Sequence, residues 1–144
     1  MTIKPLKNAD ADKIAALNEK FFSDGWNENV LISSFESGRF YVLGAFNEKE
    51  ELIAYVGYSV AGCSADIEDV FVIPEARGEK IASVLMENAL CDLKKKGVTE
   101  IFLEVREKNF IARNLYGKFG FNIVSLRKKY YRDGENALIY KKEI

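Results

Sequence analysis

The chain has 144 residues, of which 48% are hydrophobic and 30% charged, and its formal net charge is −1. This length is typical of one globular domain, so we expect residues 1–144 to form a single domain, and the near-neutral charge gives no reason to expect nucleic acid or a membrane as a partner. Histidine is absent, which excludes Ser-His and Cys-His nucleophiles and most zinc sites, so no metal site is expected and acid–base chemistry falls to Glu, Asp, Tyr or Lys.

The cysteines and the N-terminal segment indicate a cytoplasmic protein. Cys63 and Cys91 match no metal-ligand spacing, so we expect free thiols, buried as small hydrophobic side chains, in a reducing compartment. The N-terminal residues 1–8 lack the apolar core of a signal peptide. The longest uncharged run, residues 52–65, is interrupted by glycine and serine and is too short to span a bilayer.

The N-terminal part predicts a strand and two helices. Residues 2–6 can form a short strand, and residues 10–21 carry apolar side chains at helical spacing. Residues 23–25, with the sequence Ser-Asp-Gly, are typical of a turn, and a second helix is expected from about Asn27. Trp26 lies between these elements, and its large ring favours a role as a hydrophobic anchor.

Three segments rich in β-branched and aromatic residues predict neighbouring strands. Residues 40–46 and 52–62 form an antiparallel pair around an acidic turn, and residues 65–73 form the next strand. That strand contains Glu68 and Asp69 in adjacent positions, so we expect one carboxylate on each side of the sheet. A carboxylate on a covered face is costly unless it is paired or functional, so this strand holds a candidate functional group.

A strand–turn–helix unit of an anion-binding kind follows. Pro74 ends the strand, and the segment from Arg77 to Ala82 leads into a helix that runs to about Lys96, with Gly97 in the position of a helix-ending glycine. The first turn of such a helix presents unpaired backbone N–H groups and the positive end of the helix dipole. This arrangement suits a pyrophosphate.

Residues 101–121 predict a strand, a short link, a helix and the start of another strand. The first strand ends on Glu104, and Asn109 is a good N-cap for a helix that stops near Lys118, before Gly120. Helical spacing separates the side chains of this helix into two faces. We expect one set to pack on the core and the other to face away from it: Ile111, Leu115 and Phe119 against Asn109, Ala112, Arg113 and Tyr116.

The C-terminal segment predicts a β-hairpin. Residues 122–131 and 135–142 form its strands, and the turn between them contains Asp-Gly, a strong turn signal. Residues 127–132 combine basic side chains with two tyrosines, as a solvated strand end can. This cluster is short and the chain is not basic overall, so nucleic-acid binding is not predicted.

Four short motifs in residues 101–121 carry a family resemblance. They are Glu104-Val105-Arg106, Asn109, Asn114-Leu115-Tyr116 and Gly120-Phe121. Together they resemble the GNAT acetyltransferases, and among these the RimI type, which acetylates the N-terminal amine of a ribosomal protein. The resemblance covers nearly the whole chain and implies a single-domain α/β (α+β) fold. Its central sheet would be mixed, mostly antiparallel and twisted, with about seven strands flanked by four helices.

The resemblance implies an acetyl-CoA-dependent N-acetyltransferase and gives roles to particular residues. Glu104 and Tyr116 lie twelve residues apart, as do the proposed base and acid of the RimI type. Some GNAT enzymes take the base from the preceding strand, so Glu68 is an alternative to Glu104. Backbone N–H groups of Val70 and Val72 would polarise the thioester carbonyl.

The resemblance also implies where the cofactor binds. The family's phosphate-binding pattern, Gln/Arg-X-X-Gly-X-Gly/Ala, is met at Arg77 and Ala82, but Lys80 stands where the family has glycine. Either the backbone is ordinary helical at Lys80 and the lysine adds a cation for the phosphates, which we expect, or the pocket is weakened. Asn109 and Tyr116 would lie at the pantetheine end. The implied cofactor-binding residues are Val70, Val72, Arg77, Gly78, Glu79, Lys80, Ile81, Ala82, Asn109 and Tyr116.

The acceptor site implied by the resemblance lies between the first two helices and the final hairpin. Trp26, Glu68, Tyr130 and Tyr131 would bind the substrate, with the tyrosine pair as a lip over a protein or peptide amino terminus. One alternative is a GNAT enzyme for a small amine or polyamine, which an acidic acceptor pocket would favour. Another is a non-catalytic acyl-CoA-binding module, which would lack the acid–base pair. A monomer or a weak homodimer is expected.

Overall fold

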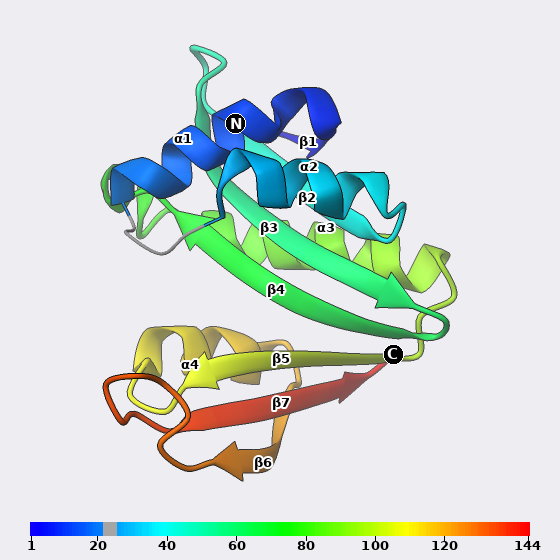
Figure 1. The fold of residues 1–144 in the computed structure, drawn as a ribbon, viewed down its shortest axis with the longest axis vertical. Coiled ribbons are helices and arrows are strands. Elements are labelled where there is room, and N and C mark those ends of the chain that lie inside the picture. The colour runs from blue at the N-terminus through cyan, green and yellow to red at the C-terminus, as the bar shows by residue number, and fades with distance from the viewer. Residues whose placement is uncertain (22–25) are drawn as a thin grey trace.

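A computed structural model describes residues 1–21 and 26–144 of the chain, and the turn expected at residues 23–25 lies outside this part. A seven-stranded sheet runs through the molecule, with helices on both of its faces (Figure 1). The elements are β1 (Thr2–Leu6), a 3-10 turn (Asn8–Asp10), α1 (Ala11–Phe21), α2 (Glu28–Glu36), β2 (Phe40–Phe46), β3 (Leu52–Ala61), β4 (Ser64–Val72), a second 3-10 turn (Pro74–Ala76), α3 (Ile81–Lys95), β5 (Glu100–Arg106), α4 (Phe110–Lys118), β6 (Asn122–Arg127) and β7 (Ala137–Glu143).

The strand order is β1-β2-β3-β4-β5-β7-β6, and the pairs are antiparallel except for β4 and β5, which are parallel. The mixed, mostly antiparallel sheet expected from the sequence is therefore confirmed. α3 forms the crossover that a parallel pair requires. In the described part of the chain, no helix is long and apolar enough to cross a membrane.

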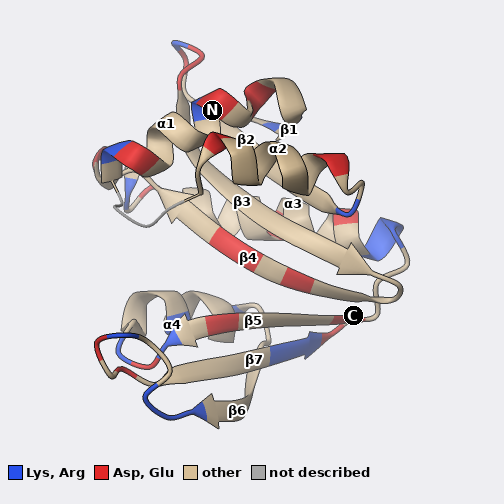
Figure 2. Ribbon diagram, in the orientation of Figure 1, with Lys and Arg blue, Asp and Glu red and all other residues tan. Residues whose placement is uncertain are grey.

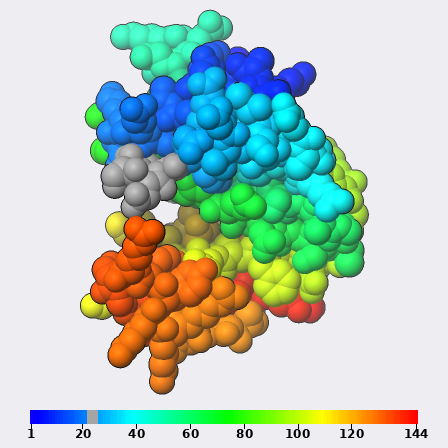
Figure 3. Space-filling view, viewed as in Figure 1, coloured from blue at the N-terminus to red at the C-terminus, as the bar shows by residue number. Residues whose placement is uncertain are grey.

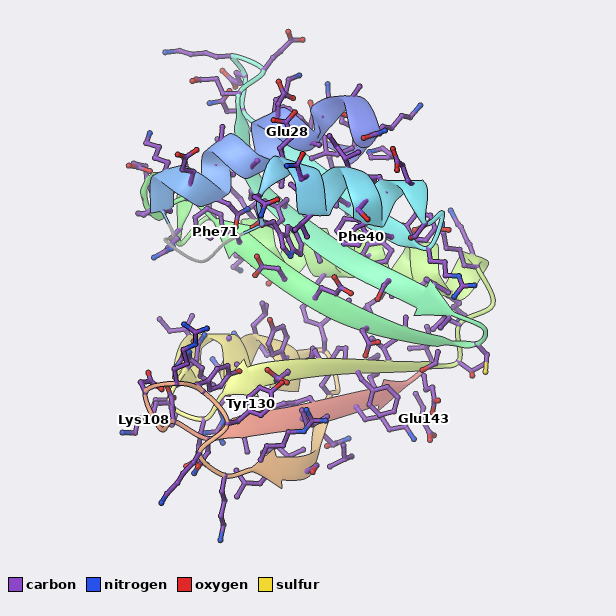
Figure 4. All side chains as sticks on the ribbon, viewed as in Figure 1. Glu28, Phe40, Phe71, Lys108, Tyr130 and Glu143 are labelled. Carbon is purple, nitrogen blue, oxygen red and sulfur yellow. The ribbon has the colours of Figure 1, made fainter. Side chains whose placement is uncertain are left out.

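Two apolar clusters hold the layers together, one on each face of the sheet. α1 and α2 cover β2 to β4 with a cluster that contains Ile14, Phe40 and Phe71. Figure 4 shows Phe40 and Phe71 beneath these helices. On the other face, side chains such as Leu85 of α3 and Tyr116 of α4 belong to the second cluster. The two faces of the sheet are thus covered by different helices, α1 and α2 on one face and α3 and α4 on the other.

The central strands β4 and β5 pair over a short distance and then separate. Their register runs from Ser64 opposite Glu100 to Ile67 opposite Leu103, after which the strands diverge (Figure 1). β4 remains paired with β3 as far as Val72, so the separation lies on its β5 side. Groups beyond residues 67 and 103 therefore face an opening between the strands, called the gap below.

A β-bulge in β4 alters the alternation expected for its two adjacent carboxylates. Gly57 of β3 pairs with Asp69, and the next residue, Tyr58, pairs with Ile67. Glu68 is therefore an extra residue that has no partner across the ladder. A bulge breaks the regular period of two, so side-chain directions after Glu68 differ from those that simple alternation predicts.

Hydrogen bonds show that both carboxylates lie on the face covered by α1 and α2. Ser59 Oγ donates to Glu68 Oε1 at 2.9 Å, and Tyr55 Oη donates to Asp69 Oδ2 at 2.8 Å. Ser59 and Tyr55 share one face of β3, because they are four positions apart and side chains two or four positions apart in a strand point to the same face. The expectation of one carboxylate on each side of the sheet is therefore wrong.

The face of α4 that packs on the core combines residues from both of the expected faces. Tyr116 is 8% exposed and its ring packs against Phe121 and Tyr140, whereas Ile111 is 88% exposed. Leu115 is partly buried, as expected. Phe119 and Ala112 also pack against this cluster, so the covered face mixes the two expected sets, and the aromatic contacts of Tyr116 place it in the core.

Two smaller expectations also differ from the structure. Cys63 and Cys91 are free but exposed, because Cys63 lies in the turn between β3 and β4 and Cys91 lies outside the buried stripe of α3. The hairpin strands are shorter than expected: β6 ends at Arg127 and β7 begins at Ala137. Residues 128–136 form a loop instead, which carries the tyrosine pair.

Candidate active site

A cavity of about 540 Å³ lies where β4 and β5 diverge. Figure 3 shows a hollow between the orange segment near residue 130 and the green strands above it, and Figure 2 shows acidic segments of β4 and β5 on facing sides. The charged and phenolic side chains that line the cavity come from β4, β5, β6 and the following loop. They are Asp66, Glu68, Glu104, Arg127 and Tyr131.

Glu104 is held by two groups from the C-terminal hairpin. Tyr131 Oη donates a hydrogen bond to Glu104 Oε1 at 3.0 Å, and Arg127 Nη1 lies 3.9 Å from Oε2. Burial, and secondarily the hydrogen bond to Glu104, raise the pKa of Tyr131 to about 12. Tyr131 therefore remains a donor at neutral pH and orients a carboxylate that still borders the cavity.

Arg106 anchors the loop that carries the tyrosine pair. Its Nη1 lies 2.9 Å from Asp133 Oδ2 and 2.9 Å from Glu135 Oε1. Its guanidinium carbon also lies 4.0 Å from the centre of the Tyr131 ring. Tyr130 packs edge-on against Tyr131 at 5.2 Å and is 49% exposed, on the loop beside the end of β5 (Figure 4). The loop thus brings Tyr131 to the cavity, and Tyr130 lies beside it without lining the cavity.

Tyr116 approaches the gap from the opposite face of the sheet. Its ring is buried against Phe121 and Tyr140. Burial, with a smaller contribution from the charge of Asp69, raises the pKa of Tyr116 to about 12. Tyr116 therefore keeps its proton at neutral pH, and its phenol lies within electrostatic range of a carboxylate from the acceptor face.

The turn before α3 has the conformation of a phosphate-binding loop. Gly78 and Lys80 both have positive φ, at +89° and +61°. α3 begins at Ile81, without a side-chain cap and without an acidic residue in its first turn. The first N–H groups of the helix are therefore available to an anion.

The helical backbone expected at Lys80 is not found. Lys80 has φ +61° and ψ +23°, in the left-handed region that glycine enters without steric cost. For a side chain with a Cβ this conformation costs about 1 kcal/mol. The turn thus keeps the shape that glycine would give it, and the exposed Lys80 side chain adds a positive charge.

Backbone groups of β4 face the gap at two predicted positions. Arg77 Nε donates to the carbonyl of Val72 at 3.0 Å, whereas the N–H of Ile73 donates to Ile53 in β3 at 3.0 Å. The N–H and C=O of a strand residue point to the same side, and alternate residues repeat that direction. Val70 and Val72 therefore direct their N–H groups away from β3. The N–H of Val70 donates to the carboxylate of Asp69, so the predicted carbonyl contact is supported at Val72.

Two other predicted site residues have contacts of a structural kind. Asn109 Oδ1 caps α4 by accepting the N–H of Ala112 at 3.2 Å. Trp26 packs against the rings of Phe40 and Tyr55, each at 5.5 Å, in the cluster beneath α1 and α2. The roles of Asn109 toward the cofactor and of Trp26 toward the acceptor stay predictions.

A buried polar chain that sequence reasoning missed leads from α1 to the gap. The N–H of Trp26 donates to Asn18 Oδ1 at 3.3 Å, and Asn18 Nδ2 donates to Tyr55 Oη at 2.7 Å. Tyr55 in turn donates to Asp69. Asn18 is 2% exposed and Tyr55 is fully buried. The position of Asn18, four residues after the apolar Ile14, could have marked it as a polar residue on a buried stripe, but nothing in the sequence identifies its partner.

Most of the chain matches the model of one protein family. The model of the acetyltransferase (GNAT) family matches residues 11–121. The chain belongs to this family. Among curated relatives of this GNAT enzyme, the ribosomal protein bS18-alanine N-acetyltransferase of Escherichia coli (strain K12) is 28% identical, over 96% of this chain and 94% of the relative. The corresponding protein of Haemophilus ducreyi is 27% identical over 95% and 96% of the two chains.

Solved structures confirm the GNAT fold. The crystal structure of the E. coli ribosomal-protein-alanine N-acetyltransferase superposes with a TM-score of 0.89 at 27% identity, covering 99% of this chain and 93% of that chain. The PaiA N-acetyltransferase of Thermoplasma acidophilum, solved with coenzyme A, has a TM-score of 0.78 at 20% identity and shares the fold along its whole length. Acetyl-CoA is the acetyl donor of the family to which this enzyme belongs.

In this GNAT enzyme the predicted residues therefore fall into two groups around the gap. Glu68, Glu104 and Tyr131 line the cavity on the face of α1 and α2. Tyr116 and the turn of residues 77–82 lie with α4 and α3, which cover the other face. Donor and acceptor can thus approach one another through the opening between β4 and β5.

Proposed function

We propose that this GNAT enzyme acetylates the α-amine of a protein amino terminus, with ribosomal protein bS18 as the first substrate to test. The main support is the convergence of Glu104 and Tyr131 on one cavity, with Tyr116 on the opposite face of the sheet. The relatives named for acetylation of bS18 match this chain over nearly its full length.

The donor side of the gap fits acetyl-CoA, which supplies the acetyl group as an activated thioester. The uncapped start of α3 and the positive-φ turn at Gly78 and Lys80 would hold the pyrophosphate through backbone N–H groups. The N–H of Val72 would stabilise negative charge on the carbonyl oxygen, whereas that of Val70 donates to the carboxylate of Asp69. Residues 70–82 would therefore position the reacting carbonyl beside the cavity.

The acceptor must lose protons for acetyl transfer to an amine to proceed. An α-amine has a pKa of about 8, so at neutral pH a weak base suffices to remove its first proton. Glu104, oriented by Tyr131, would take that proton directly or through one water. Tyr116, protonated at neutral pH, would donate to the departing thiolate sulfur, and the nitrogen releases a second proton as the amide forms.

The test is thiol release from acetyl-CoA with a hexapeptide that copies the mature amino terminus of bS18. A peptide with a blocked α-amine and a free lysine runs beside it. Turnover only with the free α-amine is the expected result, with kcat lowered about 100-fold or more by Glu104→Gln and by Tyr116→Phe. Glu68→Gln serves as the matched carboxylate control, and a larger loss there than at Glu104 would transfer the role of base to Glu68.

A second function, acetylation of a polyamine, is favoured by one observation. Asp66, Glu68 and Glu104 line the cavity against a single arginine, Arg127, among the described lining residues. Such an acidic pocket attracts a multiply charged cation. Spermidine therefore forms a third arm of the assay, and turnover with spermidine alone would replace the protein substrate by a small amine.

A further inference from the structure

Asp69 is a carboxylate without a positive partner at the edge of the gap. It lies on the bulged part of β4, beyond the last residue that pairs with β5. Its hydrogen-bond donors are neutral: Tyr55 Oη at 2.8 Å and the backbone N–H of Val70. Within the described ranges, no lysine or arginine forms an ion pair with it. A largely desolvated carboxylate in this situation is costly unless a cation joins it.

A closely similar pair on the other face of β3 shows what a completed arrangement looks like. Tyr58 Oη donates to Asp92 Oδ2 at 2.5 Å, as Tyr55 does to Asp69. Asp92 also receives Lys96 Nζ, at 2.8 Å from Oδ1 and 2.9 Å from Oδ2. The protein therefore supplies an ammonium group to one tyrosine-bound aspartate and leaves the other without one.

We propose that Asp69 binds the acceptor amine in its ammonium form, taking from the substrate the group that Lys96 supplies to Asp92. The inference rests on the proposed function only in requiring an amine acceptor, and it holds for an amino terminus and for a polyamine alike. Both arrive mainly as cations at neutral pH, because their amines have pKa values of about 8 or higher.

The position of Asp69 suits this role. Its charge acts on Tyr116, so an ammonium bound to Asp69 lies within electrostatic range of the predicted acid, which lies on the opposite face of the sheet. Tyr55 and Asn18 are positioning residues in this scheme, because they hold the carboxylate through a buried chain from α1 to β3. An ammonium group has three N–H donors to offer a carboxylate that only accepts. Among the described residues, no cluster of ligands could hold a metal ion in its place.

The experiment measures binding of amines to the enzyme–CoA complex by calorimetry, so it does not depend on turnover. The probes are the bS18 hexapeptide, the same peptide with an acetylated α-amine, and spermidine. Asp69→Asn should lower the affinity for spermidine and for the hexapeptide with a free α-amine by about 10-fold or more. This is the contribution expected of one charge-assisted hydrogen bond. The acetylated peptide should bind the variant and the unmodified enzyme equally.

Two further variants separate charge binding from structure. Asp92→Asn removes the matched tyrosine-bound carboxylate and should leave all three affinities unchanged. Tyr55→Phe should lower the affinity for both amines by a few-fold, because Asp69 remains but loses the hydrogen bond from Tyr55 Oη. In turnover, Asp69→Asn should raise the KM for the amine and leave the KM for acetyl-CoA unchanged.

The outcomes distinguish this inference from the proposed function. Amine binding that depends on Asp69, without acetylation of the hexapeptide, supports the inference and rejects the bS18 substrate. Acetylation of the hexapeptide with unchanged binding in Asp69→Asn overturns the inference and keeps the proposed function. The inference would also be overturned if Asp69→Asn and Asp92→Asn lowered the affinity for amines equally, or if the unmodified enzyme bound no amine.

Discussion

The same contact, a tyrosine hydroxyl on an aspartate, has opposite consequences on the two faces of β3. Burial alone would raise the pKa of Asp92, but hydrogen bonds from Lys96 and Tyr58 and the charges of nearby lysines together lower it. Burial raises the pKa of Asp69, and the hydrogen bonds from Tyr55 and Val70 only partly oppose that rise. A neutral donor does not compensate a desolvated carboxylate, whereas a cation does.

The difference separates a structural aspartate from one that the enzyme can use. Asp92 is completed by its own helix, four residues before Lys96, and stabilises the packing of α3 on β3. Asp69 lies at the gap, and its missing cation has to come from outside the described chain. A site that must bind a cation transiently retains an uncompensated charge, at some cost to the stability of the free protein.

Of the substitutions that test this comparison, the largest effect on stability is expected at Asp92, the structural aspartate. Asp92→Asn should lower the free energy of unfolding by about 2 kcal/mol, because charge-assisted bonds from Tyr58 and Lys96 are lost. For a chain of this size the melting temperature should fall by roughly 4–8 °C. Calorimetric unfolding measures both.

Glu87→Gln is the matched control for that variant, because it removes an exposed carboxylate from the same helix. It should change the melting temperature by less than about 1 °C, as surface substitutions usually do. A loss in Asp92→Asn no larger than in Glu87→Gln would show that the Tyr58–Asp92 pair does not anchor α3.

Local sequence pattern was sufficient for most of the fold. β2 has the bounds read from the run of apolar residues 40–46. Asn109 caps α4 as predicted, and Asn27, near which a helix was expected to begin, caps α2. These features depend on period, propensity and caps within a few residues. The pairing order of the strands was not predicted, since no local signal fixes which strands meet; the family resemblance implied only a mixed, mostly antiparallel sheet of about seven strands.

The features that depend on long-range packing could not be read in this way. The bulge at Glu68 is a mismatch between two strands, so it is invisible in either strand alone. The burial of Tyr116 depends on rings from β7 and the end of α4. Lys80 in the left-handed region shows that a turn imposed by its surroundings can override the preference of the residue.

The candidate site was predicted only in part, because some of its contacts also join residues that are distant in the sequence. Glu104 and Tyr116 were identified by a fixed spacing along the chain, and Tyr131 by a motif next to a turn. The chain from Asn18 through Tyr55 to Asp69 joins three elements that are distant in sequence. Each of its residues has an ordinary structural interpretation when taken alone, so only their contacts show that they form a unit.

At Asp69, a smaller change in stability of opposite sign is expected. Asp69→Asn should raise the free energy of unfolding at pH 7 by about 1 kcal/mol, at the low end of the gain from neutralising a buried, uncompensated charge. The folded-state pKa of Asp69 lies above its unfolded value, so protonation favours the fold. The gain should therefore disappear as the pH falls through the raised pKa and then the ordinary value of about 3.9.

Denaturant unfolding of the two proteins at pH 7 and at pH 3.5 measures this difference, provided that both are compared at the same pH. Other carboxylates titrate equally in both and cancel. A variant that is less stable than the unmodified protein at pH 7 would mean that the Tyr55–Asp69 bond outweighs the desolvation of Asp69, and that the enzyme has no uncompensated charge there.

The smallest effect concerns the cation itself. Lys96→Met removes the ammonium group, which also lies 4.4 Å from the centre of the Tyr41 ring, and leaves Asp92 with only its tyrosine, as Asp69 is. The loss should be about 0.5 kcal/mol at pH 7, as for other partly exposed pairs at this helical spacing. Since Asp92 has a lowered pKa in the fold, its contribution is present at neutral pH and is lost as the pH falls through that lowered value.

The difference between Lys96→Met and the unmodified protein should therefore shrink below about pH 4, whereas that of Asp69→Asn shrinks over a range that begins higher. Lys94→Met, which removes a charge from the same turn of α3 and has no ion pair among the described residues, is the matched control and should show no such pH dependence. If Lys94→Met and Lys96→Met lose stability equally at pH 7, then the general charge of the helix end, rather than the bond to Asp92, completes the pair. In that case Asp69 would differ from Asp92 in its surroundings but not in lacking one particular ammonium group.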